Sequence, residues 1–421
     1  MLIDYSITNY RSFRERQTLS LVAAPRLGRK DNIFRPDVEG ETLPDLLKVA
    51  VIYGPNASGK SNALKALDAV RDIVIRQPSA TAQTLPVAPF RFDSQLADRP
   101  SEFELNFIAS KQRFKFVLAA TRDRIVREQL IAFPKGREVP LYERTYEGNA
   151  DRYQFGAALE GDRSLHETWQ RLTSPQRLFL AQAVANSSEE LQQLRTPLGW
   201  LQQNLIVLPA RLPMKSLAKL GQLVASESSP FSPAEVVSFV RDLDIPITAL
   251  EFESVDDPIG SGDHGTSDKQ RLQSFLFSEV RAVLTHTSAL GHATFDFDEE
   301  SDGTQNLVGF YLIWSVLRQG RDTQLLSIDE FDSSLHPQIV ARLVKQHLDL
   351  EQPKQLIFTT HDTHLMDTRM LRRDQIWLTE RDINGATQLR AVHDFEGRES
   401  EDVEKRYYEG RYRGLPILRG S

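Results

Sequence analysis

The sequence predicts a mixed α/β fold, and three observations carry this prediction. An almost wholly apolar segment, residues 46–53, runs into a glycine-rich loop and then into residues 62–70, which have helical spacing. A second apolar segment, residues 324–328, ends in two acidic residues. Between residues 90 and 130 the pattern changes to short alternating strands, which is typical of an antiparallel sheet added to a core of buried strands.

Length and composition bound the function classes. At roughly 150 residues per domain, 421 residues suggest two or three domains, and 40% hydrophobic and 26% charged residues fit an ordinary globular protein. The longest mostly apolar run, residues 307–317, is far shorter than the roughly 20 residues that span a bilayer, so we expect a core helix there and no membrane partner. The first residues lack the features of a secretory signal, which favours a cytoplasmic location. The absence of cysteine excludes disulfides, thiolate nucleophiles and cysteine-bound zinc.

The remaining elements follow in chain order. Residues 2–13 predict a strand that ends in a polar loop, and helical patterns dominate from about 162 to 243. Within that stretch, Ser232-Pro233-Ala234-Glu235 has the residues of a capped helix start. Residues 254–271, rich in Asp, Gly and Ser, predict a mobile loop. Further expected elements are short strands at 103–107, 114–118 and 125–130, a helix at 306–317 and a strand at 355–360.

The glycine-rich loop matches the Walker A pattern for phosphate binding. In this pattern the backbone N–H groups surround the phosphates, Lys60 reaches the β- and γ-phosphates, and the Ser61 hydroxyl ligates Mg²⁺ at the positive end of a helix. A chance glycine turn is the alternative, but the preceding apolar strand and the following helix favour the binding loop. The predicted cofactor-binding residues here are Gly54, Pro55, Asn56, Ala57, Ser58, Gly59, Lys60, Ser61 and Asn62.

The two acids after the second apolar strand supply the other half of such a site. Asp329 suits water-mediated coordination of Mg²⁺, and Glu330 suits polarisation of an attacking water. Many surface strands end in acids, so this signal is strong only together with the Walker A loop. His361 follows the strand at 355–360 and is predicted to sense the γ-phosphate from a neighbouring strand, although a histidine at a strand end is usually only a polar cap.

A loop at residues 299–305 precedes the expected helix at 306–317. Its serine hydroxyl and glycine N–H could bind a phosphate at the start of the helix. Five acids crowd this region, however, and an acidic cap that complements the helix dipole is the simpler interpretation. The five acids are Asp296, Asp298, Glu299, Glu300 and Asp302.

Taken together, these elements resemble the nucleotide-binding head of ABC-type ATPases of the SMC/RecF-like branch, and in particular the bacterial RloA-like family, which is related to the ATPase domains of the OLD family. The resemblance covers the chain nearly end to end, with expected segments at 1–150 (N-terminal half of the head, with the Walker A loop and antiparallel sheet), 151–290 (inserted helical lobe) and 291–421 (C-terminal half of the head). It rests on the Walker A loop and five further runs: Asn9-Tyr10-Arg11-Ser12-Phe13, Asp329 to Pro337, Thr359 to Leu365, Arg372 to Ile376, and Tyr408 to Leu418.

The resemblance implies ATP and Mg²⁺ as cofactors and ATP hydrolysis as the activity, with Asp329 as the Walker B acid, Glu330 as the catalytic base and His361 as the switch histidine. It also implies a homodimer or higher oligomer closed by ATP, in which a signature loop acts in trans on the second subunit's ATP. The aspartate at 302 departs from the family's usual Ser-Gly-Gly, and no Q-loop glutamine is assigned. By the resemblance, the nucleotide base or α-phosphate lies near Asn9, Arg11 and Ser12, the signature loop contains Ser301, Gly303 and Thr304, and the D-loop is Ser333-Ser334-Leu335.

Three further functions compete with the leading hypothesis, which is a regulatory ATPase of an anti-phage defence complex with a separate effector nuclease or toxin. A DNA-repair head like RecF is supported by two basic segments, residues 11–35 and 405–419, although the net charge is −7. An intrinsic nuclease has weaker candidates in Asp296-Phe297-Asp298 and in the Arg342/His347 pair, which more often belongs to a solvated helix face. A transporter ATPase fits least.

Overall fold

The computed structural model describes residues 1–76, 84–208, 232–243, 245–254, 280–319, 325–333, 335–399 and 401–415. The chain divides into two units. The first contains residues 1–208, 321–332 and 340–421, and the second contains residues 209–320 and 333–339. The predicted mobile loop at 254–271 lies, from residue 255 onward, outside the described residues.

The first unit contains a six-stranded sheet in which five strands run parallel and the edge strand β18 runs antiparallel. The strand order places β16 between β5, which precedes the Walker A loop, and β15, which precedes the two acids. The predicted strands at 46–53, 324–328 and 355–360 are confirmed as β4 with β5, β15 and β16. In sheet order the strands are β11 (Leu205–Leu208), β15 (Leu325–Ile328), β16 (Gln355–Thr359), β5 (Val49–Tyr53), β17 (Ile376–Arg381) and β18 (Thr387–Ala391).

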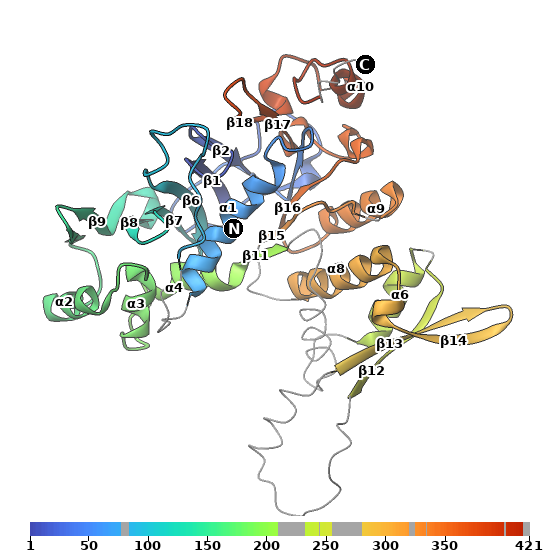
Figure 1. Cartoon of the computed structure of the whole chain (residues 1–421), viewed down its shortest axis with the longest axis horizontal. Coiled ribbons are helices and arrows are strands. Elements are labelled where there is room, and N and C mark those ends of the chain that lie inside the picture. Colours follow the sequence, from blue (N-terminus) through green and yellow to red (C-terminus); the bar gives the residue numbers. More distant parts are fainter. Residues whose placement is uncertain are drawn as a thin grey trace, which may run out of the picture. The chain divides into compact units, whose positions relative to one another are not determined.

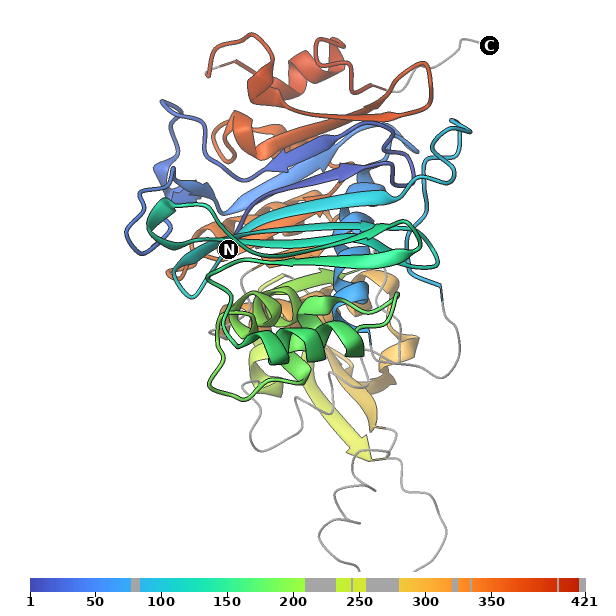
Figure 2. The ribbon, with the colours of Figure 1, turned by 90° about the vertical axis from the view of Figure 1, so that its left-hand side faces the viewer.

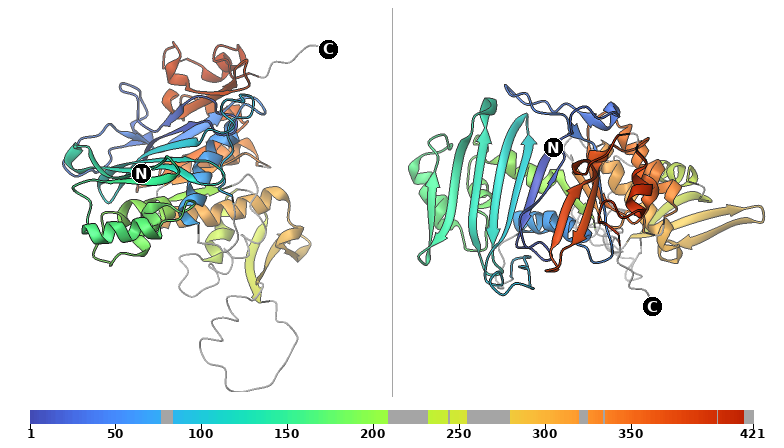
Figure 3. Two further views of the ribbon diagram at one scale, coloured as in Figure 1. Left: turned by 60° about the vertical axis from the view of Figure 1, so that its left-hand side comes forward. Right: turned by 90° about the horizontal axis from the view of Figure 1, so that it is seen from above.

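A seven-stranded antiparallel sheet forms the other layer of this unit, and its strands lie side by side in the view from above (Figure 3). The predicted antiparallel sheet is therefore confirmed, but it is larger than the pattern indicated because strands from 139 to 155 extend it. A small pair, β3 (Ile33–Phe34) and β4 (Leu46–Leu47), is separate. The seven strands in order are β10 (Ala150–Phe155), β9 (Val139–Glu147), β8 (Ile125–Phe133), β7 (Gln112–Ala120), β6 (Ser101–Ala109), β1 (Leu2–Thr8) and β2 (Gln17–Ser20).

Helix α1 (Lys60–Ile75) lies between the two sheets, where Figure 2 shows it in blue behind the antiparallel strands. Its alanine, leucine and valine side chains are buried in one core with residues of both sheets. Two tyrosines anchor it, because the Tyr5 hydroxyl donates to the Ala63 carbonyl at 3.2 Å and the Tyr10 hydroxyl donates to the Lys65 carbonyl at 3.0 Å. This packing fixes the helix whose first turn follows the Walker A loop.

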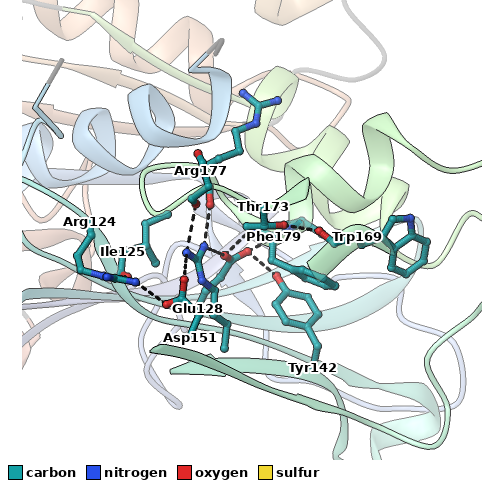
Figure 4. Close-up of polar contacts among 12 residues, drawn as sticks. Arg124, Ile125, Glu128, Tyr142, Asp151, Trp169, Thr173, Arg177 and Phe179 are labelled. Atoms are coloured by element: carbon teal, nitrogen blue, oxygen red, sulfur yellow. Dashed lines mark hydrogen bonds and ion pairs between the residues drawn. The ribbon is translucent and has the colours of Figure 1, made fainter. Parts of the chain in front are cut away.

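The first unit contains further helices besides α1 (Figure 1). Helices α2, α3 and α4 lie in the stretch 162–243, where helical patterns were predicted. Strand β11 follows them in the same stretch and belongs to the parallel sheet. Glu128 of β8 is fully buried and accepts hydrogen bonds from the first backbone N–H groups of α3, which fixes that helix on the antiparallel sheet (Figure 4). These helices are α2 (Arg163–Leu172), α3 (Phe179–Ala185), α4 (Arg195–Gly199), α9 (Pro337–Leu348, in this unit from Val340) and α10 (Val403–Tyr408).

In the described residues of the second unit, two α-helices accompany a three-stranded antiparallel sheet that the sequence patterns did not predict. Helix α6 begins as predicted, with Ser232 as N-cap and Pro233 in the first turn. The predicted helix at 306–317 is part of the longer α8, and Phe239 of α6 packs on Tyr311 of α8 with ring centroids 4.2 Å apart. The elements are α6 (Pro233–Arg241), β12 (Ile247–Ser254), β13 (Val280–Ser288), β14 (Gly291–Asp296) and α8 (Asp302–Gln319).

None of the helices in the described part of the chain is long and apolar enough to cross a membrane. The expected segments 1–150, 151–290 and 291–421 remain a prediction about how the resembling family divides such a chain.

Candidate nucleotide site

The Walker A loop leaves the end of β5 and wraps back into α1. Gly54 and Gly59 have φ values of 150° and 109°, and Ala57 has a φ of 61°. Such positive φ angles are readily adopted by glycine and cost energy for alanine, so the loop is a specialised turn and not an ordinary connection. Gly59 is the N-cap of α1, which places the helix N-terminus and its partial positive charge at the loop.

Lys60 is turned back onto the loop. Its Nζ donates to the carbonyl oxygens of Gly54 at 2.9 Å and Pro55 at 3.2 Å, and the residue is 6% exposed. Burial lowers the pKa of the Lys60 ammonium, while the carboxylates of Asp329, Glu330 and Asp332 act in the opposite direction. The ammonium is therefore held where two carbonyls satisfy it and where an anionic ligand would be a stronger partner.

Asp329 is the point where the two halves of the predicted site meet. Its Oδ1 accepts hydrogen bonds from the Ser61 hydroxyl at 2.9 Å and from the Thr359 hydroxyl at 2.7 Å. Its backbone N–H donates to the Leu208 carbonyl at 3.2 Å. The carboxyl ends of parallel strands meet at one edge of a sheet, and this brings together residues 268 positions apart in the chain.

The pairing of a serine hydroxyl with a carboxylate fits a Mg²⁺ ion bound together with phosphate oxygens, since Mg²⁺ takes oxygen ligands and few of them come from the protein. Among the described residues, no group of three or more His, Asp or Glu side chains could hold a metal ion. Under the proposed function we assign Mg²⁺ to the hydroxyl oxygen of Ser61 and the carboxylate of Asp329, which are in contact.

Glu330 has an exposed side chain and an unusual backbone. Its φ is 49°, in the left-handed region that costs a non-glycine residue of order 1 kcal/mol or more. The conformation is held by two hydrogen bonds, from the Glu330 N–H to the Thr359 hydroxyl at 2.7 Å and from the Phe331 N–H to the Thr359 carbonyl at 2.9 Å. The strained residue presents its carboxylate to solvent beside Asp329.

His361 follows β16, which pairs with β15 as the sequence predicted. Its backbone N–H donates to Asp332 Oδ2 at 3.2 Å, and its side chain is exposed. Asp332 Oδ1 is buried and has no hydrogen-bond partner among the described residues. The histidine is thus anchored through its backbone next to the two acids, while its ring is left for another partner.

The predicted signature loop lies in the second unit, where Ser301 precedes α8. Its hydroxyl accepts from the Thr304 N–H at 3.2 Å and lies 2.9 Å from the Thr304 hydroxyl. The Asn306 side chain donates to the Ser333 carbonyl at 3.4 Å, which connects this helix to the first residue of the predicted D-loop. Ser301 and Asp302 are exposed, and Gly303 lies between Asp302 and the buried Thr304. Ser334 lies outside the described residues.

The N-terminal residues predicted near the nucleotide base have different surroundings. Asn9 is 3% exposed, and its amide donates to the carbonyls of Leu96, Arg99 and Pro100 while its Oδ1 accepts from the Phe90 N–H. These bonds engage its side chain inside the protein, where it fixes a loop, and do not favour a contact with a ligand. Arg11 is exposed and its Nε donates to the Tyr10 hydroxyl at 3.0 Å.

Ser12 does lie at the Walker A loop, because its hydroxyl accepts from the Asn62 side chain at 2.9 Å. Two of the residues around the site, Thr359 and Asp332, were not predicted. The run Thr359-Thr360-His361 after a buried strand was the signal that could have indicated Thr359.

Several basic residues of the two basic segments are paired with acids of the same chain. Arg16 contacts Glu104 at 3.0 Å, Arg35 contacts Asp45 at 2.5 Å, and Arg406 contacts Glu401 at 2.6 Å. These pairs reduce the positive charge that the segments present to a phosphate backbone. Arg419 lies outside the described residues.

The sequence offered two interpretations of Arg342 and His347, a solvated helix face and a nuclease pair. Both are wrong for His347, because this residue is buried. His347 on α9 is 1% exposed, and its Nε2 bonds to the Lys354 carbonyl at 3.2 Å. Burial lowers its pKa to about 4, so the ring is neutral at ordinary pH. A buried, neutral imidazole that bonds a backbone carbonyl has no access to a nucleic-acid phosphate.

A comparison with protein families agrees with this geometry. The family described as "AAA domain, putative AbiEii toxin, Type IV TA system" matches residues 49–367, a span that begins with β5 and ends just after His361. The chain belongs to this AAA-domain family. The span contains the Walker A loop, both acids of the β15 end and the predicted signature loop, so membership supports an AAA-type ATPase domain.

Solved structures with similar folds include SMC head domains. The head domain from Thermotoga maritima is 13% identical, with a TM-score of 0.41 over 93% of this chain and 98% of that chain. The Smc head with an extended coiled coil, bound to the C-terminal domain of ScpA derived from Pyrococcus furiosus, is 9% identical, with a TM-score of 0.43 over 93% and 97%. No functional inference rests on similarities this distant. No curated protein matches the chain significantly.

Proposed function

We propose that this AAA-domain protein binds ATP with Mg²⁺ and hydrolyses it at the edge of the parallel sheet. The observation that carries the proposal is the contact of the Ser61 hydroxyl with the Asp329 carboxylate, with Lys60 and Glu330 beside it. A loop that can surround phosphates, a lysine, a pair of oxygen donors and an exposed carboxylate are the parts that phosphoryl transfer to water requires.

The roles follow from the positions. Lys60 leaves its carbonyl partners to contact the β- and γ-phosphates, because a phosphate oxygen is a stronger acceptor for an ammonium group. Ser61 and Asp329 hold Mg²⁺, which neutralises charge that develops on the phosphates. Glu330 orients and deprotonates the attacking water, and His361 contacts the γ-phosphate. Most other cofactor contacts of Gly54 to Asn62 come from backbone N–H groups.

ATP also joins two copies of the chain in this proposal. The signature residues Ser301, Gly303 and Thr304 approach the ATP of the partner copy, and the D-loop lies between the two sites. Support comes from the exposed position of Ser301 at the start of α8 and from its connection to Ser333 through Asn306. Hydrolysis by Glu330 then releases the two copies.

At the level of the cell, we propose a sensor or regulatory subunit of a bacterial anti-phage defence complex that controls a separate nuclease or toxin. The family description, which names a putative toxin of a type IV toxin–antitoxin system, supports a defence setting. The alternative, a DNA-repair head, has less support because acids of the same chain pair with several residues of its basic segments.

Phosphate release from ATP tests the catalytic part. Glu330→Gln should lower the rate at least about a hundredfold, since a general base contributes typically 10²–10⁴-fold. Lys60→Ala should abolish ATP binding. Matched controls are Glu351→Gln and Lys65→Ala, which remove the same groups from exposed positions in the same unit and should leave the rate unchanged. An unchanged rate in Glu330→Gln would reject the assigned base.

Size-exclusion chromatography of Glu330→Gln with ATP and Mg²⁺ tests the oligomer. A dimer that forms with ATP and is absent with ADP is expected, and Ser301→Arg in the same background should prevent it by blocking the signature loop. A monomer under all conditions would refute ATP-driven dimerisation.

Binding to duplex DNA at increasing salt tests the alternative of a DNA-repair head, because several phosphate contacts would give a steep loss of affinity.

A further inference from the structure

The hairpin of β17 and β18 lies against the Walker A loop from the side opposite β16. Strand β17 pairs with β5 in parallel, with Leu378 opposite Tyr53, so Thr379 comes level with Gly54 at the start of the loop. The return strand β18 begins at Thr387. Both threonines are buried, at 0% and 1% exposure.

Both threonines bind the same loop residue, Ser58. The Thr379 hydroxyl lies 2.6 Å from the Ser58 hydroxyl and 3.1 Å from the Tyr53 carbonyl oxygen. One hydroxyl carries one proton and a carbonyl can only accept, so Thr379 donates to Tyr53 and accepts from Ser58. The side chain of Ser58 is thereby directed towards β17.

Thr387 holds the main chain of Ser58 in the same way. Its hydroxyl lies 2.7 Å from the Ser58 carbonyl oxygen and 2.7 Å from the Ser12 hydroxyl. Thr387 is the donor in both contacts, so its single hydroxyl proton is shared between the Ser58 carbonyl and Ser12, and Ser12 also accepts from the Asn62 amide at 2.9 Å. A continuous chain of hydrogen bonds thus runs from α1 through Ser12 and Thr387 back to the loop.

The approach is close enough to require the loop glycines. A Cβ atom on Gly59 would meet the Thr387 and Ser12 hydroxyls, and a Cβ on Gly54 would meet Thr379 and Ser58. Ser58 itself follows Ala57, whose positive φ is unfavourable for a residue with a side chain. The two threonines hold the chain directly after this strained position.

We propose that Thr379 and Thr387 are positioning residues that hold the Walker A loop ready for the phosphates of ATP. The inference rests on the proposed ATP binding and goes beyond it, because it assigns the affinity for ATP in part to hydroxyls that never touch the nucleotide. A loop fixed before binding loses less conformational entropy when the ligand arrives, which raises affinity without altering the chemical step.

The test exploits the fact that valine and serine separate a hydroxyl role from a packing role. Valine keeps the volume of threonine and removes the hydroxyl, whereas serine keeps the hydroxyl and removes a methyl group. Thr387→Val and Thr379→Val should each raise Kd and KM for ATP about tenfold, the equivalent of one buried hydrogen bond of about 1.4 kcal/mol, and change kcat less than about twofold. Thr387→Ser and Thr379→Ser should retain wild-type values within about twofold.

Thr145→Val on β9, in the antiparallel sheet, is the matched control and should leave Kd unchanged. Kd is measured by calorimetry with ATP and Mg²⁺, and thermal unfolding of each variant shows that it is folded. If the valine variants do not fold, Ser58→Ala removes the hydroxyl bond to Thr379 from the loop side and should raise Kd, though by less than tenfold because the Thr379 bond to the Tyr53 carbonyl remains.

The outcomes separate the two proposals. If the wild type binds ATP, Lys60→Ala does not, and the valine variants bind like the wild type, then the positioning role is refuted and the proposed function stands. The positioning role is equally refuted if serine weakens binding more than valine, since packing then explains the threonines. If the wild type does not bind ATP, the proposed function fails and the positioning role fails with it.

Discussion

The nucleotide site around Asp329 and the ion cluster around Glu128 lie in the same unit, and both bring carboxylates together with basic side chains. In the Glu128 cluster, Arg144 and Glu128 are fully buried, and the Arg144 guanidinium contacts Asp151 at 2.9 Å and two backbone carbonyls. Glu128 accepts from Tyr142 and from two backbone N–H groups (Figure 4). Groups within the chain thus satisfy both Glu128 oxygens and both terminal nitrogens of Arg144, and only Arg144 Nε in this pair lacks a hydrogen-bond partner among the described residues.

The nucleotide site is arranged differently. Glu330 and the His361 ring are exposed, Asp332 Oδ1 is without a partner in the described part of the chain, and Lys60 is bound only to neutral carbonyls. The density of charge is therefore no guide to function by itself. What distinguishes the two regions is whether the protein satisfies its own charges or leaves them for a ligand.

The largest effect expected from this comparison is on stability, at Arg144. Arg144→Met should lower the free energy of unfolding by about 3–5 kcal/mol, because it removes the cation beside the buried Glu128 carboxylate and the donor to Asp151 Oδ2 and two backbone carbonyls. Arg127→Met, on the same sheet, removes an arginine whose side chain is 45% exposed and should cost less than about 1 kcal/mol. Urea unfolding measures both, and equal losses would show that burial does not set the cost.

A second prediction concerns the buried His347. Its pKa is lowered to about 4 in the folded protein, while in the unfolded chain it is near 6.5. Below pH 6.5 the unfolded state takes up a proton that the folded state does not, so stability falls as the pH drops from 6.5 towards 4. The loss approaches about 3 kcal/mol from this group. The contribution of His347 is the unfolding free energy of the wild type minus that of His347→Gln, a variant that keeps a donor for the Lys354 carbonyl. A difference that does not change between pH 6.5 and 4 would contradict the lowered pKa of His347.

The third prediction moves to the nucleotide site, where Asp329→Asn should affect activity and not stability. Loss of the carboxylate charge that would hold Mg²⁺ should lower the turnover of ATP about a hundredfold, which corresponds to about 2.7 kcal/mol in the barrier. The free energy of unfolding should change by less than about 1 kcal/mol, because the amide still accepts from Ser61 and Thr359. Asp349→Asn, exposed at the end of α9, is the control, and comparable turnover in both variants would exclude the metal role.

The parts of the site that the sequence predicted are those encoded by consecutive residues. The Walker A loop and the Asp329-Glu330 pair each follow an apolar strand, and strands of a parallel sheet bring their ends together whatever the intervening chain does. The residues that were missed, Thr359, Thr379 and Thr387, are ordinary strand threonines in the sequence. Their roles arise from the pairing of β16 and β17 with β5, which depends on contacts between distant segments.

The fold shows the same limit. The buried strands and the alternating strands of the antiparallel sheet were visible as patterns, since burial on one or two faces determines them directly. The sheet of β12 to β14 was missed because its strands are largely polar, and β14 in particular is mostly exposed. Asn9 looked like a ligand residue from its motif, but its interior hydrogen bonds to the 90–100 loop could not be read from neighbouring residues.

The smallest effect is expected for the exposed pair of Arg16 and Glu104. Arg16 is 54% exposed on its side chain and contacts Glu104 at 3.0 Å, while Lys115 contacts the same carboxylate at 3.1 Å. A double-mutant cycle with Arg16→Gln and Glu104→Gln should give a coupling of less than about 1 kcal/mol that decreases with salt, because solvent screens the pair and Lys115 compensates for Arg16. A coupling energy that is insensitive to salt and as large as the loss of unfolding free energy expected for Arg144→Met would mean that exposed pairs in this basic segment stabilise the fold. Buried and exposed charge pairs would then no longer differ in their contribution to stability.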